Sequence, residues 1–151
     1  VGRAVGNVRQ GQGPPTDPVA PAASPHLLLG NPSNAVADVA RDLHGYLITP
    51  RYFALSYNRD RGSPNWVTWR LQRSDLGPAD RSEFRPDTSL LVQFRRTVPR
   101  DCMNSGFDRG HLCPWSDRTG TQPMADSTLL MTSIVPPSPH LNQWAWNDLE
   151  E

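Results

Sequence analysis

The sequence predicts an α+β domain on a mainly antiparallel sheet, and two features support this prediction. The first half of the chain contains aromatic and β-branched stretches separated by turn residues, which is typical of strands in a hairpin. The last third follows a pattern of strand, loop, strand, turn and helix. With 151 residues the chain can form one domain with a hydrophobic core but is short for two full domains.

The first 25 residues differ in composition from the rest of the chain. Segment 1–25 is rich in Gly, Pro and Ala and has hardly any large apolar side chain. Such a segment buries too little apolar surface to offset the entropy lost on ordering. We therefore expect a disordered leader over 1–25 and a folded domain over 26–151.

Three strands are expected in the first half of the domain. Segments 46–49 and 52–57 fit a hairpin or a pair of strands, and 58–64 fits a loop. Segment 65–71 alternates, so that Val67, Trp69 and Leu71 should face the core. A polar loop over 74–88 follows, and its arginines Arg81 and Arg85 are expected to be solvated more often than bound to a phosphate backbone.

The last third is expected to form strands over 106–112 and 128–135 and a helix that starts at His140. The proline-rich run 136–139 disfavours both helix and strand and predicts a turn. The sequence ends at Glu151, inside this helix, so the domain is expected to be truncated at its C-terminus.

Charge and composition leave the partner open. The 15 basic and 15 acidic residues balance, so net charge gives no reason to expect a nucleic-acid partner. All basic residues are arginine, whose planar fork suits phosphate but does not prove contact with it. No apolar run is long enough to span a bilayer, and no membrane partner is expected.

The candidate chemistry lies in the first of the two C-terminal strands. In an extended strand, Arg109 and His111 project from one face, whereas Asp108 projects from the other. A neutral imidazole can take a proton from water, and a guanidinium can neutralise charge that develops on a phosphate. Gly110 leaves room for a close approach between them.

Two polar residues of the expected helix are candidates for holding a metal ion. Asn142 and Glu150 are eight positions apart, which is roughly 12 Å along a helix, so they seldom bind one ion directly. A hydrated Mg²⁺ can accept one amide oxygen directly and a carboxylate through water. Judged on spacing alone, a role of Asn142 as the N-cap of the helix is as well supported as a role as metal ligand.

The sequence resembles the DNA/RNA non-specific endonuclease family in three blocks, which are 106–114, 130–136 and 141–150. The upstream segment 65–69 also resembles this family. The family includes secreted bacterial sugar-non-specific nucleases and mitochondrial endonuclease G. The resemblance implies a ββα-metal (His-Me) finger and a metal-dependent endonuclease that cuts DNA and RNA and leaves 5′-phosphate ends. A secreted or periplasmic location is accordingly favoured over a cytoplasmic one.

The resemblance also implies roles for individual residues. His111 would be the general base, Asn142 the protein ligand of Mg²⁺ (or Mn²⁺), and Arg109 the contact to the scissile phosphate. Glu150 would act in catalysis by holding a metal-bound water. Arg70 is a second candidate substrate contact, and Asp108 and Gly110 are expected to support the strand. A cognate inhibitor protein and a homodimer are further expected partners.

Several features depart from the family or leave alternatives open. Residues 133–137 lack the amide side chains usual at the end of the second strand, which keeps a catalytically inactive, nucleic-acid-binding relative in view. Trp144 replaces a small residue and is expected to pack in the core. Cys102 and Cys113 are candidates for a disulfide. A zinc-stapled binding module would instead use Cys102, His111, Cys113 and His140.

Overall fold

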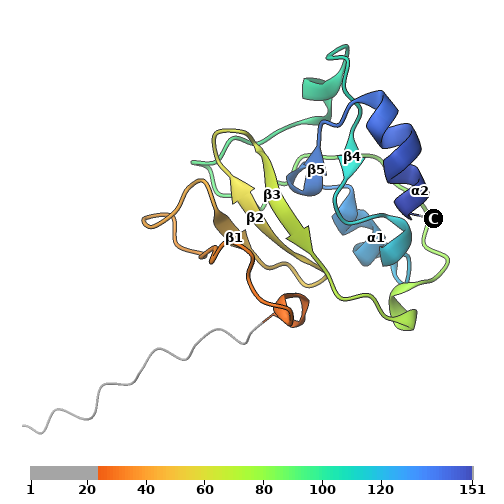
Figure 1. Cartoon of the computed structure of the whole chain (residues 1–151), viewed down its shortest axis with the longest axis horizontal. Coiled ribbons are helices and arrows are strands. Elements are labelled where there is room, and N and C mark those ends of the chain that lie inside the picture. Colours follow the sequence, from red (N-terminus) through yellow and green to blue (C-terminus); the bar gives the residue numbers. More distant parts are fainter. Residues whose placement is uncertain (1–23, 151) are drawn as a thin grey trace, which may run out of the picture.

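The computed structural model describes residues 24–150, with the side chains of 24–149, so the predicted leader lies almost wholly outside the described residues. The fold is mixed α and β with antiparallel sheets, as predicted. Figure 1 shows a three-stranded sheet on one side of the molecule and a short two-stranded ribbon with two helices on the other.

The three-stranded sheet has the order β1-β2-β3, and both pairs are antiparallel. Its strands are β1 (Tyr46–Ile48), β2 (Ala54–Asn58) and β3 (Ser63–Thr68). The predicted hairpin is confirmed, and Val67 and Trp69 pack against the core as expected. The expectation for Leu71 is wrong, because β3 ends at Thr68 and leaves Leu71 exposed.

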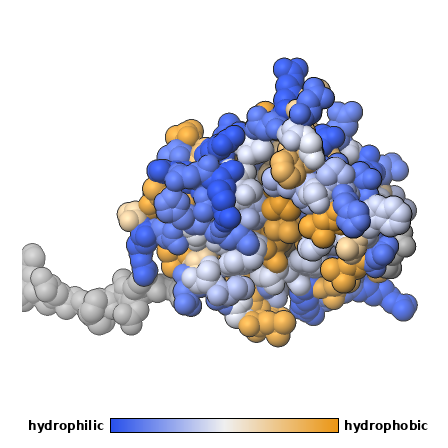
Figure 2. All heavy atoms as spheres, turned by 45° about the horizontal axis from the view of Figure 1, so that its top comes forward, coloured by the Kyte–Doolittle hydropathy of each residue, from blue (hydrophilic) through white to orange (hydrophobic). Residues whose placement is uncertain are grey.

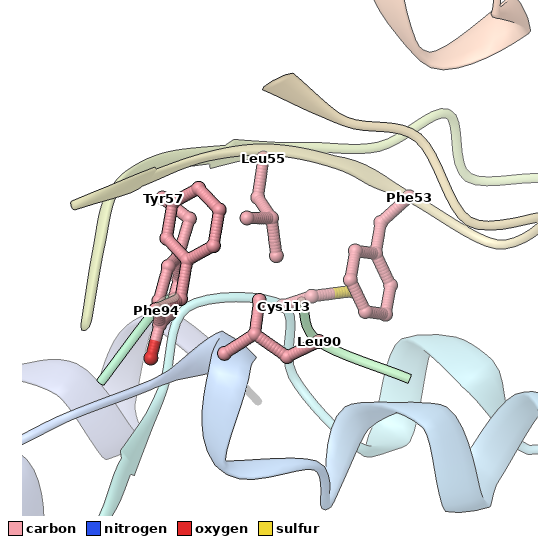
Figure 3. Close-up of a cluster of buried hydrophobic side chains, with 6 residues drawn as sticks. All are labelled: Phe53, Leu55, Tyr57, Leu90, Phe94 and Cys113. Atoms are coloured by element: carbon pink, nitrogen blue, oxygen red, sulfur yellow. The ribbon is translucent and has the colours of Figure 1, made fainter. Parts of the chain in front are cut away.

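The main apolar core lies against one face of β2. Phe53, Leu55 and Tyr57 alternate along the chain, and their side chains point to the same side, into the core, as Figure 3 shows. There they pack with Leu90, Phe94 and Cys113. Cys113 is buried in this cluster and forms no disulfide with Cys102. The thiol therefore contributes to packing as a small apolar group.

The two-stranded ribbon is much shorter than the sequence predicted. It pairs β4 (Gly110–His111) with β5 (Ile134–Val135). The strand expected over 106–112 therefore shrinks to two residues, and most of 128–135 is helical or turn. Pro123 lies in the first turn of α1 (Gln122–Thr128), where its ring fits a helix start, and η5 (Met131–Ser133) follows. Hydrogen bonds from Ser133 Oγ to the carbonyls of Thr128 and Leu130, both 3.0 Å, hold the turn between them.

The predicted C-terminal helix is present but unusual. It consists of the π-helical segment η6 (Leu141–Trp146), followed directly by α2 (Asn147–Glu150). A π-helical turn is rare and is frequently found at functional sites. The other short helices are η1 (Pro25–Leu27), η2 (Arg73–Asp75), η3 (Pro99–Cys102) and η4 (Ser116–Arg118).

A buried arginine joins segments that are far apart in the sequence. The Arg118 side chain is 1% exposed and donates hydrogen bonds to the carbonyls of Tyr52, at 2.8 Å, and Arg70, at 2.9 Å. It also forms an ion pair with Asp75 at 3.3 Å. These partners satisfy the guanidinium, as burial of a charge requires.

The surface is mixed in polarity. Figure 2 shows apolar patches interspersed among hydrophilic side chains on one face of the molecule. Within residues 24–150, no helix has both the length and the apolar character needed to cross a bilayer.

Candidate active site

The short ribbon places His111 next to the C-terminal helix. His111 pairs with Ile134 across the ribbon, and the Leu112 N–H donates to the Ser133 carbonyl at 3.2 Å. On the helix side, Trp146 Nε1 donates to the His111 carbonyl at 3.0 Å. The backbone of His111 is therefore fixed from both sides, which fixes where its imidazole can point.

The His111 side chain is buried and lacks polar partners at one nitrogen. The residue is 7% exposed, and its Nε2 has no hydrogen-bond partner among the described residues. Burial, together with the nearby positive charge of Arg81, lowers the pKa of His111 to about 4. The imidazole is therefore neutral at physiological pH and keeps a lone pair available for a proton.

Phe84 lies between the imidazole and a cavity. Its ring centroid lies 5.2 Å from that of His111, and the Arg109 guanidinium lies 4.7 Å over the same phenyl ring. A cation at this distance is attracted to the ring face. Arg109 and His111 thus approach a common surface as predicted, although through contacts with Phe84 rather than through a regular strand face.

The cavity beside Phe84 has a volume of about 270 Å³ and gathers several predicted site residues. Asp108, Arg109 and Asn142 line it, together with Arg81. His111 lines a neighbouring, mainly apolar cavity of about 230 Å³, and Asn142 contributes to the walls of both. Asn142 is therefore the residue through which the imidazole side and the arginine side of the site meet.

The orientation of Asn142 is fixed by a carboxylate. Asp108 Oδ2 accepts hydrogen bonds from Asn142 Nδ2, at 3.2 Å, and from Gln143 Nε2, at 3.0 Å. The amide oxygen then faces Gly110, where an added Cβ would lie only 2.9 Å from it. The N-cap interpretation of Asn142 is wrong, because the helix cap is His140 and Asn142 acts as a donor to Asp108.

Of the two other predicted residues, one lies outside the described side chains and the other lines a different pocket. Glu150 ends α2, and its side chain lies outside the described part of the chain. Arg70 lines a different pocket with His26 and Gln72, and its guanidinium donates to Gln72 Oε1 at 2.9 Å. Its role as a substrate contact stays a prediction.

The loop that carries Arg81 and Phe84 contributes to the candidate site. Arg81 is exposed, as expected, and it also lines the cavity, with its guanidinium 5.9 Å over the Trp115 ring. Arg85 instead forms an ion pair with Asp126 at 3.9 Å. Arg81 and Phe84 have no regular spacing to the 106–114 block, so in the sequence only the length of their loop indicated a functional role.

Two alternatives from the sequence do not survive. In residues 24–149 no three His, Cys, Asp or Glu side chains are placed to hold a metal together, so the zinc-stapled module is not formed. Cys113 lies in the apolar core instead. The expected burial of Trp144 is also wrong, because this residue is 66% exposed and stacks on His140 with centroids 6.4 Å apart.

Fold and site together define an α+β protein in which a buried histidine lies beside a cavity lined by two arginines. The family model for DNA/RNA non-specific endonuclease matches residues 33–151. The chain belongs to this family. The resemblance in the three sequence blocks is therefore confirmed.

Individual relatives agree with this assignment. The chain is 43% identical to a nuclease of Nostoc sp. over 94% of its length and 52% of the relative's. It is 40% identical to human mitochondrial endonuclease G over 66% of its length and 34% of the relative's. A crystal structure of the EndoG/EndoGI complex is similar with a TM-score of 0.70 at 25% identity, covering 89% of this chain and 53% of that one. The chain thus spans about a third to a half of these proteins.

Proposed function

We propose that this chain carries the active site of a metal-dependent endonuclease that hydrolyses phosphodiester bonds in DNA and RNA with little sequence preference. The observation that supports it most strongly is the buried, neutral His111 beside a cavity lined by Arg109 and Asn142. Family membership supports the same reaction class.

His111 is proposed as the general base. With a pKa lowered to about 4, it is unprotonated at neutral pH and can accept a proton from an attacking water at Nε2. Because Nε2 is shielded from solvent, a neighbouring side chain must move before water can reach it. Phe84 is the natural candidate, since it lines the cavity and contacts the imidazole.

Arg109 and Arg81 are proposed to bind the scissile phosphate. Both line the cavity, and neither forms an ion pair with a carboxylate in the described part of the chain. Their charges are therefore available to a phosphodiester and to the charge that develops on it. Contacts that stop at phosphates carry no sequence information, which agrees with activity on DNA and RNA alike.

The residues present fit a hydrated hard cation held by few protein atoms. The Asn142 oxygen is a ligand of the kind that Mg²⁺ or Mn²⁺ accepts, and the absence of a side chain at Gly110 lets this amide lie close to the ribbon. Asp108 would orient this amide, and Glu150 is proposed to reach the same ion through water. When bound, the metal would stabilise negative charge on the phosphate and on the leaving 3′-oxygen, which yields 5′-phosphate ends.

The test is cleavage of supercoiled plasmid and of single-stranded RNA by the purified chain, with Mg²⁺ or with EDTA. We expect metal-dependent cleavage of both substrates. The His111→Ala change should lower the rate about 10²- to 10⁴-fold, the range for loss of a general base. His44→Ala is the matched control, because His44 is exposed and lies outside the cavity.

The outcomes separate this proposal from its alternative. Tight nucleic-acid binding by a folded chain that does not cleave in Mg²⁺ would indicate an inactive relative and overturn the proposal. Equal cleavage by the His111→Ala and His44→Ala variants would overturn the assignment of the base. Inhibition by a cognate protein, as in the EndoG/EndoGI complex, and a homodimer stay further proposals about partners.

A further inference from the structure

A second cleft adjoins the active-site cavity and contains two further arginines. It has a volume of about 240 Å³, and its wall includes Arg61, Arg95 and Thr97. The two hollows share Cys102 and Phe107, which line both. The two hollows therefore meet at these two residues.

The two arginines of this cleft are not neutralised by ion pairs within the described residues. Neither Arg61 nor Arg95 forms an ion pair with a carboxylate among residues 24–149. Arg61 donates to the neutral Asn65 Oδ1, a contact that leaves its net charge intact. The acidic residue of the lining, Asp101, accepts the neutral Val98 N–H at 3.0 Å and keeps its charge, so the two arginines leave the cleft with an excess of one positive charge.

The geometry of the hairpin turn brings the two arginines to the same cleft. Gly62, between β2 and β3, has a φ of +66°, and an added Cβ would lie 3.1 Å from Arg95 Cδ. The stem of Arg95 therefore packs directly against the turn that carries Arg61. Thr97 Oγ1 donates to the Gly62 carbonyl and fixes this contact.

An aromatic ring lies on the wall that the two cavities share. Arg81 and Arg109 line the cavity on one side of it, and Arg61 and Arg95 line the cleft on the other. Phe107 is 51% exposed and lines the cleft together with the apolar residues Met131 and Ile134. Its loop is fixed locally, since Ser105 Oγ donates to the Cys102 carbonyl at 2.9 Å and accepts the Phe107 N–H at 3.2 Å. A held, exposed phenyl ring beside cationic clefts is a suitable surface on which a base can stack.

We propose that the Arg61–Arg95 cleft is a second phosphate subsite for an unpaired nucleic-acid strand, and that a base stacks on Phe107 between this cleft and the active-site cavity. The proposal rests on the proposed function, because it takes the active-site cavity as the place of the scissile phosphate. The order cation, aromatic ring, cation follows the alternation of phosphates and bases along a strand.

Binding measurements in EDTA test the subsite without requiring cleavage. The Kd of a fluorescent single-stranded DNA octamer is measured by anisotropy as a function of salt. The double change Arg61→Ala and Arg95→Ala should raise Kd about tenfold and reduce the slope of log K against log salt by about 1.4, or 0.7 for each lost contact. The control is Arg41→Ala with Arg73→Ala, which removes two exposed charges away from the cleft.

The stacking part has its own pair of variants. Phe107→Leu should raise Kd roughly fivefold or more, the lower end of the cost of losing one stacked base, whereas Phe107→Tyr should bind as the unchanged chain does. Equal losses in the cleft variant and the control would overturn the subsite, and equal binding by the Leu and Tyr variants would overturn the stacking.

Failure of the subsite and failure of the nuclease function give different results. A chain that cleaves DNA and RNA but binds the octamer equally well with and without Arg61 and Arg95 refutes the subsite alone. A chain that does not cleave but loses binding in the cleft variant supports the subsite and refutes the nuclease function.

Discussion

The three-stranded sheet and the finger segment, residues 106–150, are held together in different ways. In the sheet, β2 pairs on both sides and buries Phe53, Leu55 and Tyr57 in one apolar cluster. In the finger segment the ribbon has two residues in each strand, and side-chain hydrogen bonds carry much of the structure. Examples are the bonds from Trp146 to the His111 carbonyl and from Asn142 to Asp108.

This difference separates stability from chemistry. Apolar packing in the sheet is insensitive to the detail of any one polar contact, so this half can serve as a rigid base. The finger segment also buries Leu129 and Met131, but around its short ribbon it depends on a few directional contacts, and it includes a buried imidazole without a partner at Nε2. Substitutions in the sheet should therefore change mainly the free energy of unfolding, and substitutions in the finger segment should change mainly the site.

The largest effect on stability is expected in the sheet. Phe53→Ala should lower the free energy of unfolding by about 3–5 kcal/mol, because Phe53 is 1% exposed and its loss leaves a cavity. Urea denaturation measures the change. Phe107→Ala in the finger segment is the matched control, because its ring is half exposed and should cost far less. Similar losses of unfolding free energy at both positions would contradict the view that the sheet provides the stability and the finger segment the site.

The next effect concerns pH and His111. The pKa of this group is about 4 in the folded chain and about 6.5 when unfolded, so between these values the unfolded chain binds a proton that the folded chain does not. The free energy of unfolding should therefore fall as pH drops from 6.5 to 4, by about 3 kcal/mol in total. Denaturation of the unchanged chain and of His111→Gln isolates this contribution. Parallel pH dependences in the two chains would show that the imidazole titrates normally.

A smaller effect is expected on metal affinity. Asp108→Ala removes the acceptor that orients the Asn142 amide, and loss of such an orienting partner typically weakens metal binding about 10- to 100-fold. The Mg²⁺ concentration that gives half-maximal cleavage should rise by that factor, with little change in unfolding. Asp38→Ala, at an exposed position outside the cavity, is the control. An unchanged Mg²⁺ dependence would remove Asp108 from this role.

The smallest effect tests the link between the helix and the ribbon. Trp146→Phe keeps most of the ring but removes the hydrogen bond to the His111 carbonyl, which should cost about 1 kcal/mol of stability. Trp144→Phe provides the comparison, since its indole is exposed. Thermal unfolding that shifts equally in both variants would mean that this hydrogen bond contributes nothing.

The sequence predicted the sheet better than the finger segment, for a physical reason. Alternation of apolar residues sets both the strand and its buried face, so the hairpin over 46–57 and the inward side of Val67 and Trp69 followed from the pattern. The strands expected over 106–112 and 128–135 were mostly wrong. Their short pairings depend on tertiary contacts such as those of Ser133, which local propensity does not encode.

For the candidate site, the sequence was informative about the finger segment and uninformative about the loop that packs against it. A family motif was enough to single out His111, Arg109 and Asn142, and the last two line one cavity with the imidazole close by. The motif gave no information on Phe84 and Arg81, because these residues approach from a loop with irregular spacing. Exposure of Trp144 was also missed, since an aromatic residue in a short helix has no period that separates buried from exposed positions.

The two cysteines give the molecule a chemical reporter at a useful place. Cys113 is fully buried, whereas Cys102 is partly exposed on the wall between the active-site cavity and the arginine cleft. Partial burial raises the pKa of the Cys102 thiol, so alkylation should need mildly alkaline buffer. A small environment-sensitive fluorophore attached there would sit beside the proposed path of the strand. Its emission would then follow the arrival and departure of nucleic acid in real time, without any substitution in the chain.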